Sequence, residues 1–179
     1  GGSKVHADDT PLPVLAPGKG RTKTARLWTY VRDDRPAGSG DPPAVWFAYS
    51  EDRKGQHPRD HLKSFRGILQ ADAYSGFDAL CEIGKIQEAA CWAHVRRKFV
   101  DVYRAQASPI AAEAISRIAS LYAVESQIRG QSPGERRIIR QTQTQPLLHA
   151  LHAWLEGQRQ RVSRKSGIAD AIGYALNHW

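Results

Sequence analysis

The chain has 179 residues and a formal net charge of +8, from 26 Lys and Arg against 18 Asp and Glu. This length allows one domain of ordinary size or a core with an appended helical lobe, and the basic excess favours an acidic partner, most commonly nucleic acid. No apolar run approaches the roughly 18 residues that cross a bilayer, and no signal peptide is visible. Two cysteines exclude a disulfide scaffold, so we expect a cytoplasmic protein without a membrane partner.

The sequence contains no methionine, which leads us to expect a piece of a longer protein. Its first part has the pattern of strands. Residues 4–10 carry Asp8 and Asp9 near their end, and prolines keep residues 11–15 extended. Residues 26–32 and 44–49 are rich in aromatic and β-branched side chains, which predicts two further strands in an antiparallel meander. The basic loop at 16–21 has glycines, but its spacing fits a hairpin turn rather than a phosphate-binding loop.

A change of pairing is predicted at residues 58–65, where proline in a first turn and spaced apolar residues indicate a short helix. Such a crossover allows the next strand, from Ile68, to lie parallel to the first strand. That strand delivers Asp72 to its end, before the break at Ser75-Gly76. A strand-ending Asp alone is more often a turn former. With Asp8 on the first strand, however, two carboxylates can converge on one site.

The remainder alternates a short helix at 77–81 and a fifth strand at 86–91 with a long helical region from residue 93 onward. Ser108-Pro109 is a helix start, Ser132 to Glu135 has capping-box spacing, and Pro146 opens a further helix. A last helix is predicted over 166–179. The apolar stripes of these helices are expected to form a core. Arg159, Arg161, Arg164 and Lys165 make a basic stretch that is either a DNA backbone contact or a solvated corner.

Three motifs in order, at residues 6–11, 69–74 and 91–99, resemble the catalytic domain of the insertion-sequence-66 family of transposases, which are bacterial enzymes of the DDE type. The resemblance implies an α/β (α+β) protein with an RNase H-like five-stranded mixed sheet, followed by an α-helical insertion. Residues 1–103 would form an incomplete catalytic core and residues 104–179 the insertion. The implied activity is Mg²⁺- or Mn²⁺-dependent strand cleavage and strand transfer on the ends of a mobile DNA element, in a nucleoid-associated homo-oligomeric complex.

Carried onto this sequence, the first catalytic Asp of the family falls on Asp8 and the second on Asp72, with Asp9 where the family often has Glu. Two Mg²⁺ ions roughly 4 Å apart need bridging carboxylates for an in-line displacement at phosphorus. Hard oxygen ligands suit Mg²⁺. Because side chains alternate along a strand, only one of Asp8 and Asp9 can face Asp72. We predict that Asp8 does, and that Asp8 and Asp72 are the catalytic and metal-binding residues.

The third acid of the family, a Glu in an Asn-rich motif after the insertion, is not found before the chain stops at Trp179. We therefore expect the chain alone to be inactive or nearly so. Two alternatives stay open. One is a truncated relic that only binds DNA or a partner subunit. The other is a generic RNase H-like nuclease that acts on RNA hybrids.

The motif Cys91-x-x-His94 has the spacing of a zinc half-site, but the sequence has no other cysteine–histidine pair with ligand spacing, so a packing and polar role is preferred. The residues that follow it open a helix, which could turn basic side chains toward the DNA backbone near the metals. The predicted nucleic-acid-binding residues are His94, Arg96, Arg97 and Lys98. The alternative is that the arginines are ordinary solvated charges.

Overall fold

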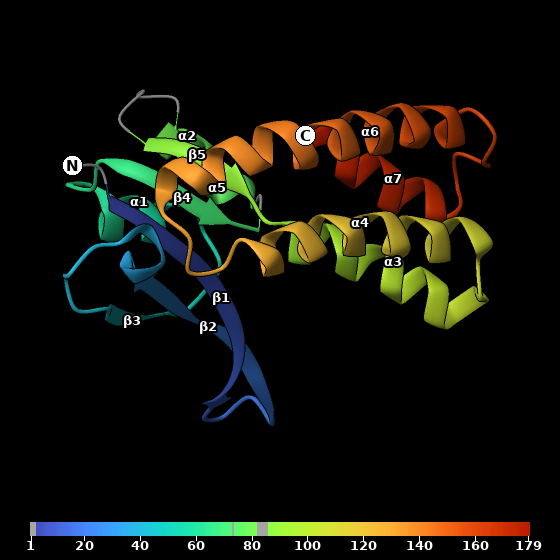
Figure 1. Cartoon of the computed structure of the whole chain (residues 1–179). Coiled ribbons are helices and arrows are strands. Elements are labelled where there is room, and N and C mark those ends of the chain that lie inside the picture. The colour runs from blue at the N-terminus through green and yellow to red at the C-terminus, as the bar shows by residue number, and fades with distance from the viewer. Residues whose placement is uncertain (1–2, 73, 82–85) are drawn as a thin grey trace. The chain divides into compact units, whose positions relative to one another are not determined.

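The computed structural model describes residues 3–72, 74–81 and 86–179 (Figure 1). The chain divides into two compact units. The strand unit comprises Gly1–Arg35 with Ser39–Cys91, and the helical unit comprises Trp92–Trp179 with the short segment Pro36–Gly38. This division lies at the start of the helix that carries Arg96. The functional boundary after residue 103, between catalytic core and insertion, stays a prediction.

The strand unit is built on one five-stranded mixed sheet with the strand order β3-β2-β1-β4-β5. The pairs β1–β2 and β2–β3 are antiparallel, whereas β1–β4 and β4–β5 are parallel. The prediction of a five-stranded mixed sheet in an α+β protein is thereby confirmed, and the arrangement is consistent with an RNase H-like fold. The strands are β1 (Ser3–Ala16), β2 (Arg21–Arg32), β3 (Ala44–Ser50), β4 (Gly67–Ala71) and β5 (Ile86–Ala90).

The hairpin of β1 and β2 is longer than the sequence predicted, because β1 continues without a break through the two prolines at 11 and 13. Figure 1 shows this ribbon extending beyond the other strands of its unit. Its turn contains Gly18 and Gly20 at φ values of +80° and +61°, a backbone region that favours glycine. The basic glycine-bearing loop is therefore a hairpin turn, as expected.

Short helices lie between the strands along the chain. They are α1 (Gln56–Leu62), the 3₁₀ turn η2 (Ser75–Phe77) and α2 (Asp78–Cys81), and a further 3₁₀ turn, η1, spans Arg35–Ala37. The crossover through α1 makes β4 parallel to β1, as predicted. These helices supply Leu62, Phe77 and Leu80 to the core of the unit. The sheet supplies the other buried residues of this core: Ala7, Trp28, Tyr30, Leu69, Ala71 and Ile86.

One edge of this core contains a histidine. The hydroxyl of Tyr30 and Nδ1 of His61 lie 2.9 Å apart, and the His61 ring packs edge-on against the rings of Trp28 and Trp46. Burial lowers the pKa of His61 from its ordinary 6.5, and the charge of His57 adds to this effect while Asp60 opposes it. Protonation of His61 is thus easier in the unfolded chain than in the folded one.

We expect the strand unit to lose stability as the pH falls below about 6.5, because the unfolded state then takes up a proton that folded His61 resists. Above that pH both states hold a neutral imidazole and the effect vanishes. His61→Gln should flatten the decline in melting temperature between about pH 7 and pH 5. His149→Gln, on an exposed position of the helical unit, is the matched control. An unchanged pH profile in His61→Gln would contradict this account.

The helical unit follows directly after β5. Its helices are α3 (Trp92–Gln106), α4 (Pro109–Gln127), α5 (Pro133–Ile139), α6 (Gln145–Arg159) and α7 (Gly167–Asn177). Ser108, Ser132 and Ser166 cap α4, α5 and α7 by accepting hydrogen bonds from backbone amides, and Ser132 with Glu135 forms the predicted capping box. None of the helices in the described part of the chain has the length and apolar character needed to cross a membrane.

The predicted helix starting at Pro146 is joined to the one before it. A π-helical turn, Arg140–Thr144, continues α5 directly into α6. Arg140 in this turn forms a two-point ion pair with Glu125 of α4, with both N···O distances 2.6 Å. The apolar stripes form one core, as expected. Its buried members are Val95, Phe99, Val102, Ala111, Ala114, Ile118, Leu121, Leu151, Leu155, Ile168, Ala171, Ile172 and Ala175.

Candidate functional site

The acidic residues singled out by the sequence lie at adjacent strands of the sheet. Alternation along β1 puts Ala7 and Asp9 on the face that packs against the core, and Asp8 on the other face, where it is exposed. Asp72 follows directly after Ala71, the last residue of β4. The parallel register between β1 and β4 ends at the pair His6 and Gln70, two residues before Asp8 and Asp72. Both acids therefore follow the paired part of two adjacent parallel strands, and their convergence on one site stays a prediction.

The ion pairs of the structure, in contrast, link Asp9 to Asp72 through the guanidinium of Arg53. Nη2 of Arg53 lies 2.7 Å from Oδ1 of Asp9 and 2.9 Å from Oδ2 of Asp72, so one nitrogen contacts both carboxylates. Arg26 adds a second cation, 2.9 Å from the other oxygen of Asp9. Only 2% of the Asp9 side chain is exposed, while Asp8 accepts a hydrogen bond from the Asp9 amide. Asp9, which the sequence argument passed over, is thus the most tightly held acid of the group.

Arg53 is held by an aromatic neighbour as well as by acids. Its guanidinium carbon lies 4.0 Å from the centre of the Tyr74 ring, and the Tyr74 hydroxyl donates a hydrogen bond to the Arg53 carbonyl. The Tyr74 amide donates to Oδ1 of Asp72 at 3.1 Å. Burial lowers the pKa of Arg53, but the hydrogen bond and charge of Asp9, with the charge of Asp72, outweigh this effect and raise it. Arg53 therefore stays a cation between the acids.

Two glycines let these loops meet. A Cβ atom on Gly55, two residues after Arg53, would lie 2.9 Å from the backbone of Gly76, closer than side-chain carbons ordinarily approach. The segment after β3 and the segment after β4 are therefore in direct backbone contact. Sequence reasoning missed Arg53 because one arginine in a polar loop resembles any other, and its partner Asp9 is 44 positions away. The nearby glycines were the available signal.

The donor set suits a hard divalent cation, because carboxylate oxygens are the ligands that Mg²⁺ prefers. Asp8 is exposed, and Asp72 is 21% exposed at its side chain. Within residues 3–72, 74–81 and 86–179, no group of three or more His, Cys, Asp or Glu side chains is placed to hold a metal. These carboxylates can thus supply part of a coordination shell, and the guanidinium of Arg53 already neutralises charge there.

The motif at 91–99 spans the end of the strand unit and the start of α3. Cys91 is a free, half-buried thiol. His94 is half-buried, and its Nδ1 atom is buried without a hydrogen-bond partner among the described residues. Lys98 lies over the ring of Tyr174, with Nζ 5.3 Å from the ring centre. Of the four predicted DNA-contacting residues, Arg96 and Arg97 are the ones that line a common concave surface.

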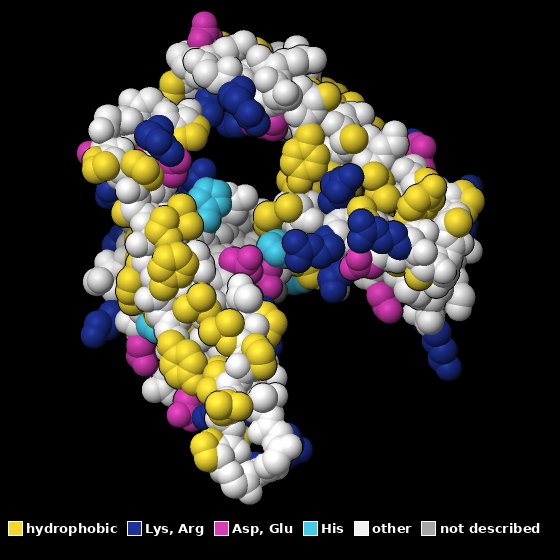
Figure 2. Space-filling model, turned by 90° about the horizontal axis from the view of Figure 1, so that it is seen from below, with side chains coloured by type: hydrophobic (Ala, Val, Ile, Leu, Met, Phe, Trp, Pro, Cys, Tyr) yellow, Lys and Arg dark blue, Asp and Glu magenta, His cyan; other side chains and the backbone are white. Residues whose placement is uncertain are grey.

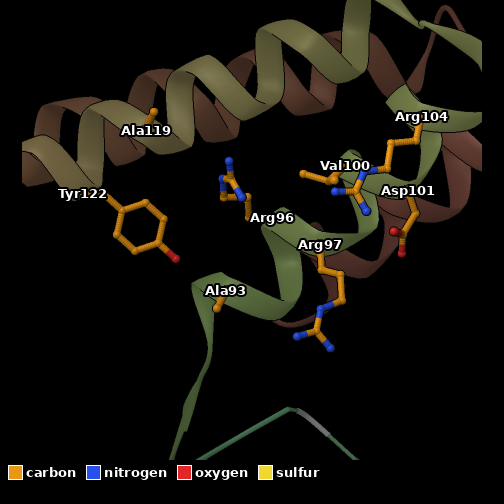
Figure 3. A pocket seen from close by; sticks show the side chains of 8 residues that line it. All are labelled: Ala93, Arg96, Arg97, Val100, Asp101, Arg104, Ala119 and Tyr122. Atoms are coloured by element: carbon orange, nitrogen blue, oxygen red, sulfur yellow. The ribbon is translucent and has the colours of Figure 1, made fainter.

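A groove of about 610 Å³ lies between α3 and α4, and we call it the arginine groove. Figure 3 shows Arg96 pointing from α3 toward α4, and Arg97 pointing away from α4. Figure 2, seen from the side of these two helices, shows Lys and Arg side chains gathered over them. In the described part of the chain, no ion pair involves Arg96, Arg97 or Arg104. The lining residues are Ala93, Arg96, Arg97, Val100, Asp101, Arg104, Ala119 and Tyr122.

The order of the mixed sheet and the carboxylates at its adjacent parallel strands define an α+β protein of RNase H-like arrangement. The chain belongs to the Transposase IS66 family, which it matches over residues 2–179. It is 40% identical to the uncharacterized protein y4hP and 41% identical to the uncharacterized protein y4jD, both of Sinorhizobium fredii (strain NBRC 101917 / NGR234). The alignments cover 98% of this chain but 34% and 36% of those proteins, so the chain spans about a third of their length.

Proposed function

We propose that this chain is the catalytic segment of a DNA transposase, for metal-dependent strand cleavage and strand transfer at the ends of a bacterial insertion sequence. The observation that carries the proposal is that β1, which contains Asp8, and β4, which Asp72 follows, are adjacent parallel strands in a member of a transposase family. The Asp9–Arg53–Asp72 ion pairs show that carboxylates from both strands reach a common cation.

Asp8 and Asp72 are the proposed ligands of Mg²⁺ or Mn²⁺. When bound, such ions stabilise charge on the attacking and leaving oxygens of phosphoryl transfer. Asp9 has a different proposed role, because Arg26 and Arg53 already occupy both of its oxygens. It anchors Arg53 beside Asp72. The family pattern implies a third acid, a Glu, and the chain alone is expected to cleave DNA poorly or not at all without it.

A second candidate function is a module that binds DNA or a partner subunit without catalysis. It is favoured by the way Arg53 already neutralises Asp72, which leaves the site stable without a metal ion. A crystal soaked in Mn²⁺ separates the two functions. Anomalous density between Asp8 and Asp72 supports the catalytic segment. Absence of density there, at a Mn²⁺ concentration that fills weak sites, favours the binding module.

The proposed partner is DNA, at transposon ends and target, in a homo-oligomeric complex. Arg96 and Arg97, with Arg104 from the next turns of α3, are proposed to contact backbone phosphates from the arginine groove. Their guanidinium groups suit phosphate because they remain charged and present several donors in one plane. His94 and Lys98 are proposed to take part in DNA binding as well. His94 is half-buried near the start of α3, and its proposed contribution is to orient this end of the helix.

Charge reversal in the arginine groove is expected to weaken DNA binding and its dependence on salt. For the double variant Arg96→Glu/Arg104→Glu, the slope of log affinity against log salt should fall by about 1 for each phosphate that the protein no longer neutralises. Fluorescence anisotropy with a labelled duplex at several salt concentrations measures this. The double variant Arg129→Glu/Arg137→Glu, at two exposed positions of the helical unit, has the same net charge and is the control. Equal slopes in the double variant and the control would leave the arginines as solvated charges.

A further inference from the structure

We infer that Arg53 is a positioning residue that serves as the resident cation of the acidic site, and that it releases Asp72 when a divalent metal ion is bound there. The inference rests on the proposed function, since it concerns the same site. In this view Arg53 competes with the metal ion for Asp72. The affinity for the metal then depends on displacement of the Arg53 guanidinium as well as on the carboxylates.

The competition follows from the oxygen that Arg53 uses. Oδ2 of Asp72 accepts from Nη2 of Arg53, and Oδ1 accepts from the Tyr74 amide. Both oxygens of Asp72 therefore have protein donors. A metal cation bound by Asp72 needs at least one of these oxygens. It would repel the Arg53 guanidinium, whose Nη2 lies 2.9 Å from Oδ2 of Asp72. The Tyr74 amide carries no net charge, so the contact that must yield is the one to Arg53.

Arg53 can yield without leaving the site, because its two acidic partners hold it unequally. Asp9 receives three hydrogen bonds from Nε and Nη2 of Arg53, at 2.9, 3.0 and 2.7 Å. Asp72 receives one from Arg53, at 2.9 Å. The Asp9 side chain is almost fully buried, whereas Asp72 and Arg53 are partly exposed. Release of Asp72 therefore leaves the fork on Asp9 and the stacking on Tyr74 intact.

A purely structural clamp makes the opposite prediction. If Arg53 only holds the loops together, its removal would let Asp72 move and would weaken metal binding or leave it unchanged. If Arg53 competes, its removal takes a positive charge away from Asp72, and a divalent ion takes the vacated place more readily. The sign of the change in metal affinity thus separates the two roles.

The test is Mn²⁺ titration of the full chain, with free Mn²⁺ followed by electron paramagnetic resonance. Arg53→Gln is expected to bind Mn²⁺ about fivefold more tightly than the unmodified chain, the size of effect that a partly exposed ion pair supports. Its melting temperature should be lower without metal and should rise more on addition of Mn²⁺. Arg32→Gln, which removes one positive charge elsewhere in the strand unit, controls for net charge. Affinity in Arg53→Gln equal to or weaker than in this control overturns the inference.

A measurement on the unmodified chain keeps the inference testable if Arg53→Gln does not fold. The ¹⁵N resonances of the Arg53 side chain should shift on Mg²⁺ titration, with a midpoint equal to that of metal binding. An unchanged Arg53 spectrum at saturating Mg²⁺ overturns the inference while the metal site stands. If neither Mg²⁺ nor Mn²⁺ binds to any form of the chain, the proposed metal site fails, and the inference fails with it.

Discussion

Asp72→Asn is expected to weaken Mn²⁺ binding by about 100-fold or more, since even the loss of a group that only supports a metal ligand costs 10- to 100-fold. The amide keeps the size of the side chain but removes the charge that a hard cation requires. Titration followed by electron paramagnetic resonance measures the change. Asp60→Asn, an exposed position on α1, removes the same charge away from the site and should leave the affinity nearly unchanged.

The same assay assigns the two neighbouring acids of β1. Asp8→Asn should lower Mn²⁺ affinity as Asp72→Asn does, because Asp8 is the proposed second ligand and its side chain is exposed. Asp9→Asn should chiefly destabilise the strand unit, because it leaves Arg26 and Arg53 facing a buried neutral amide. Loss of metal binding in Asp9→Asn with full affinity in Asp8→Asn would reverse our assignment of the ligand on β1.

Trp28→Ala is expected to lower the free energy of unfolding of the strand unit by about 3–5 kcal/mol. Trp28 is fully buried, and its indole nitrogen donates a 2.7 Å hydrogen bond to Oγ of Ser50. Its removal would leave a large cavity against Phe77 and Tyr74 and a buried hydroxyl with one partner fewer. Urea denaturation, with circular dichroism to follow the sheet and the helices, measures the loss.

Trp46→Ala is the matched control, because Trp46 is 47% exposed and stacks on Tyr30 at a ring distance of 5.0 Å. It should cost about 1–2 kcal/mol, the worth of its ring contacts with Tyr30 and His61. A similar loss in both variants would mean that the core of the strand unit is less dependent on Trp28 than its burial indicates.

The strand pattern, the crossover and the helix caps could be predicted because their signals are local. Proline and glycine punctuate the hairpin, and a serine followed by proline starts α4 and α5. The π-turn before Pro146 could not be predicted, since a proline near a helix start is read as a new beginning. The ion pair of Arg140 in this turn with Glu125 of α4 is a contact between segments 15 positions apart, which a local pattern does not contain.

The site was predictable to the extent that it depends on strand ends. Asp72 at the end of β4 follows from the apolar run and the break after it, and alternation correctly separates Asp8 from Asp9. Whether Asp8 or Asp9 shares a cation with Asp72 depends on the position of Arg53. The contacts of Arg53 with Asp9 and Asp72 join residues 44 and 19 positions apart in the sequence. No local sequence pattern contains such contacts. The role of Asp8 as a ligand therefore remains a prediction that the metal titrations decide.

The close approach of Gly55 and Gly76 makes the electrostatics of this site sensitive to a change that carries no charge. A methyl group at position 55 would push apart the two loops that place Arg53 and Asp72. Arg53 would stay with Asp9, to which it is more strongly bound, and its positive charge would move away from Asp72. The absence of one carbon atom, the Cβ at position 55, thus allows the loops to hold the Arg53 charge close to Asp72.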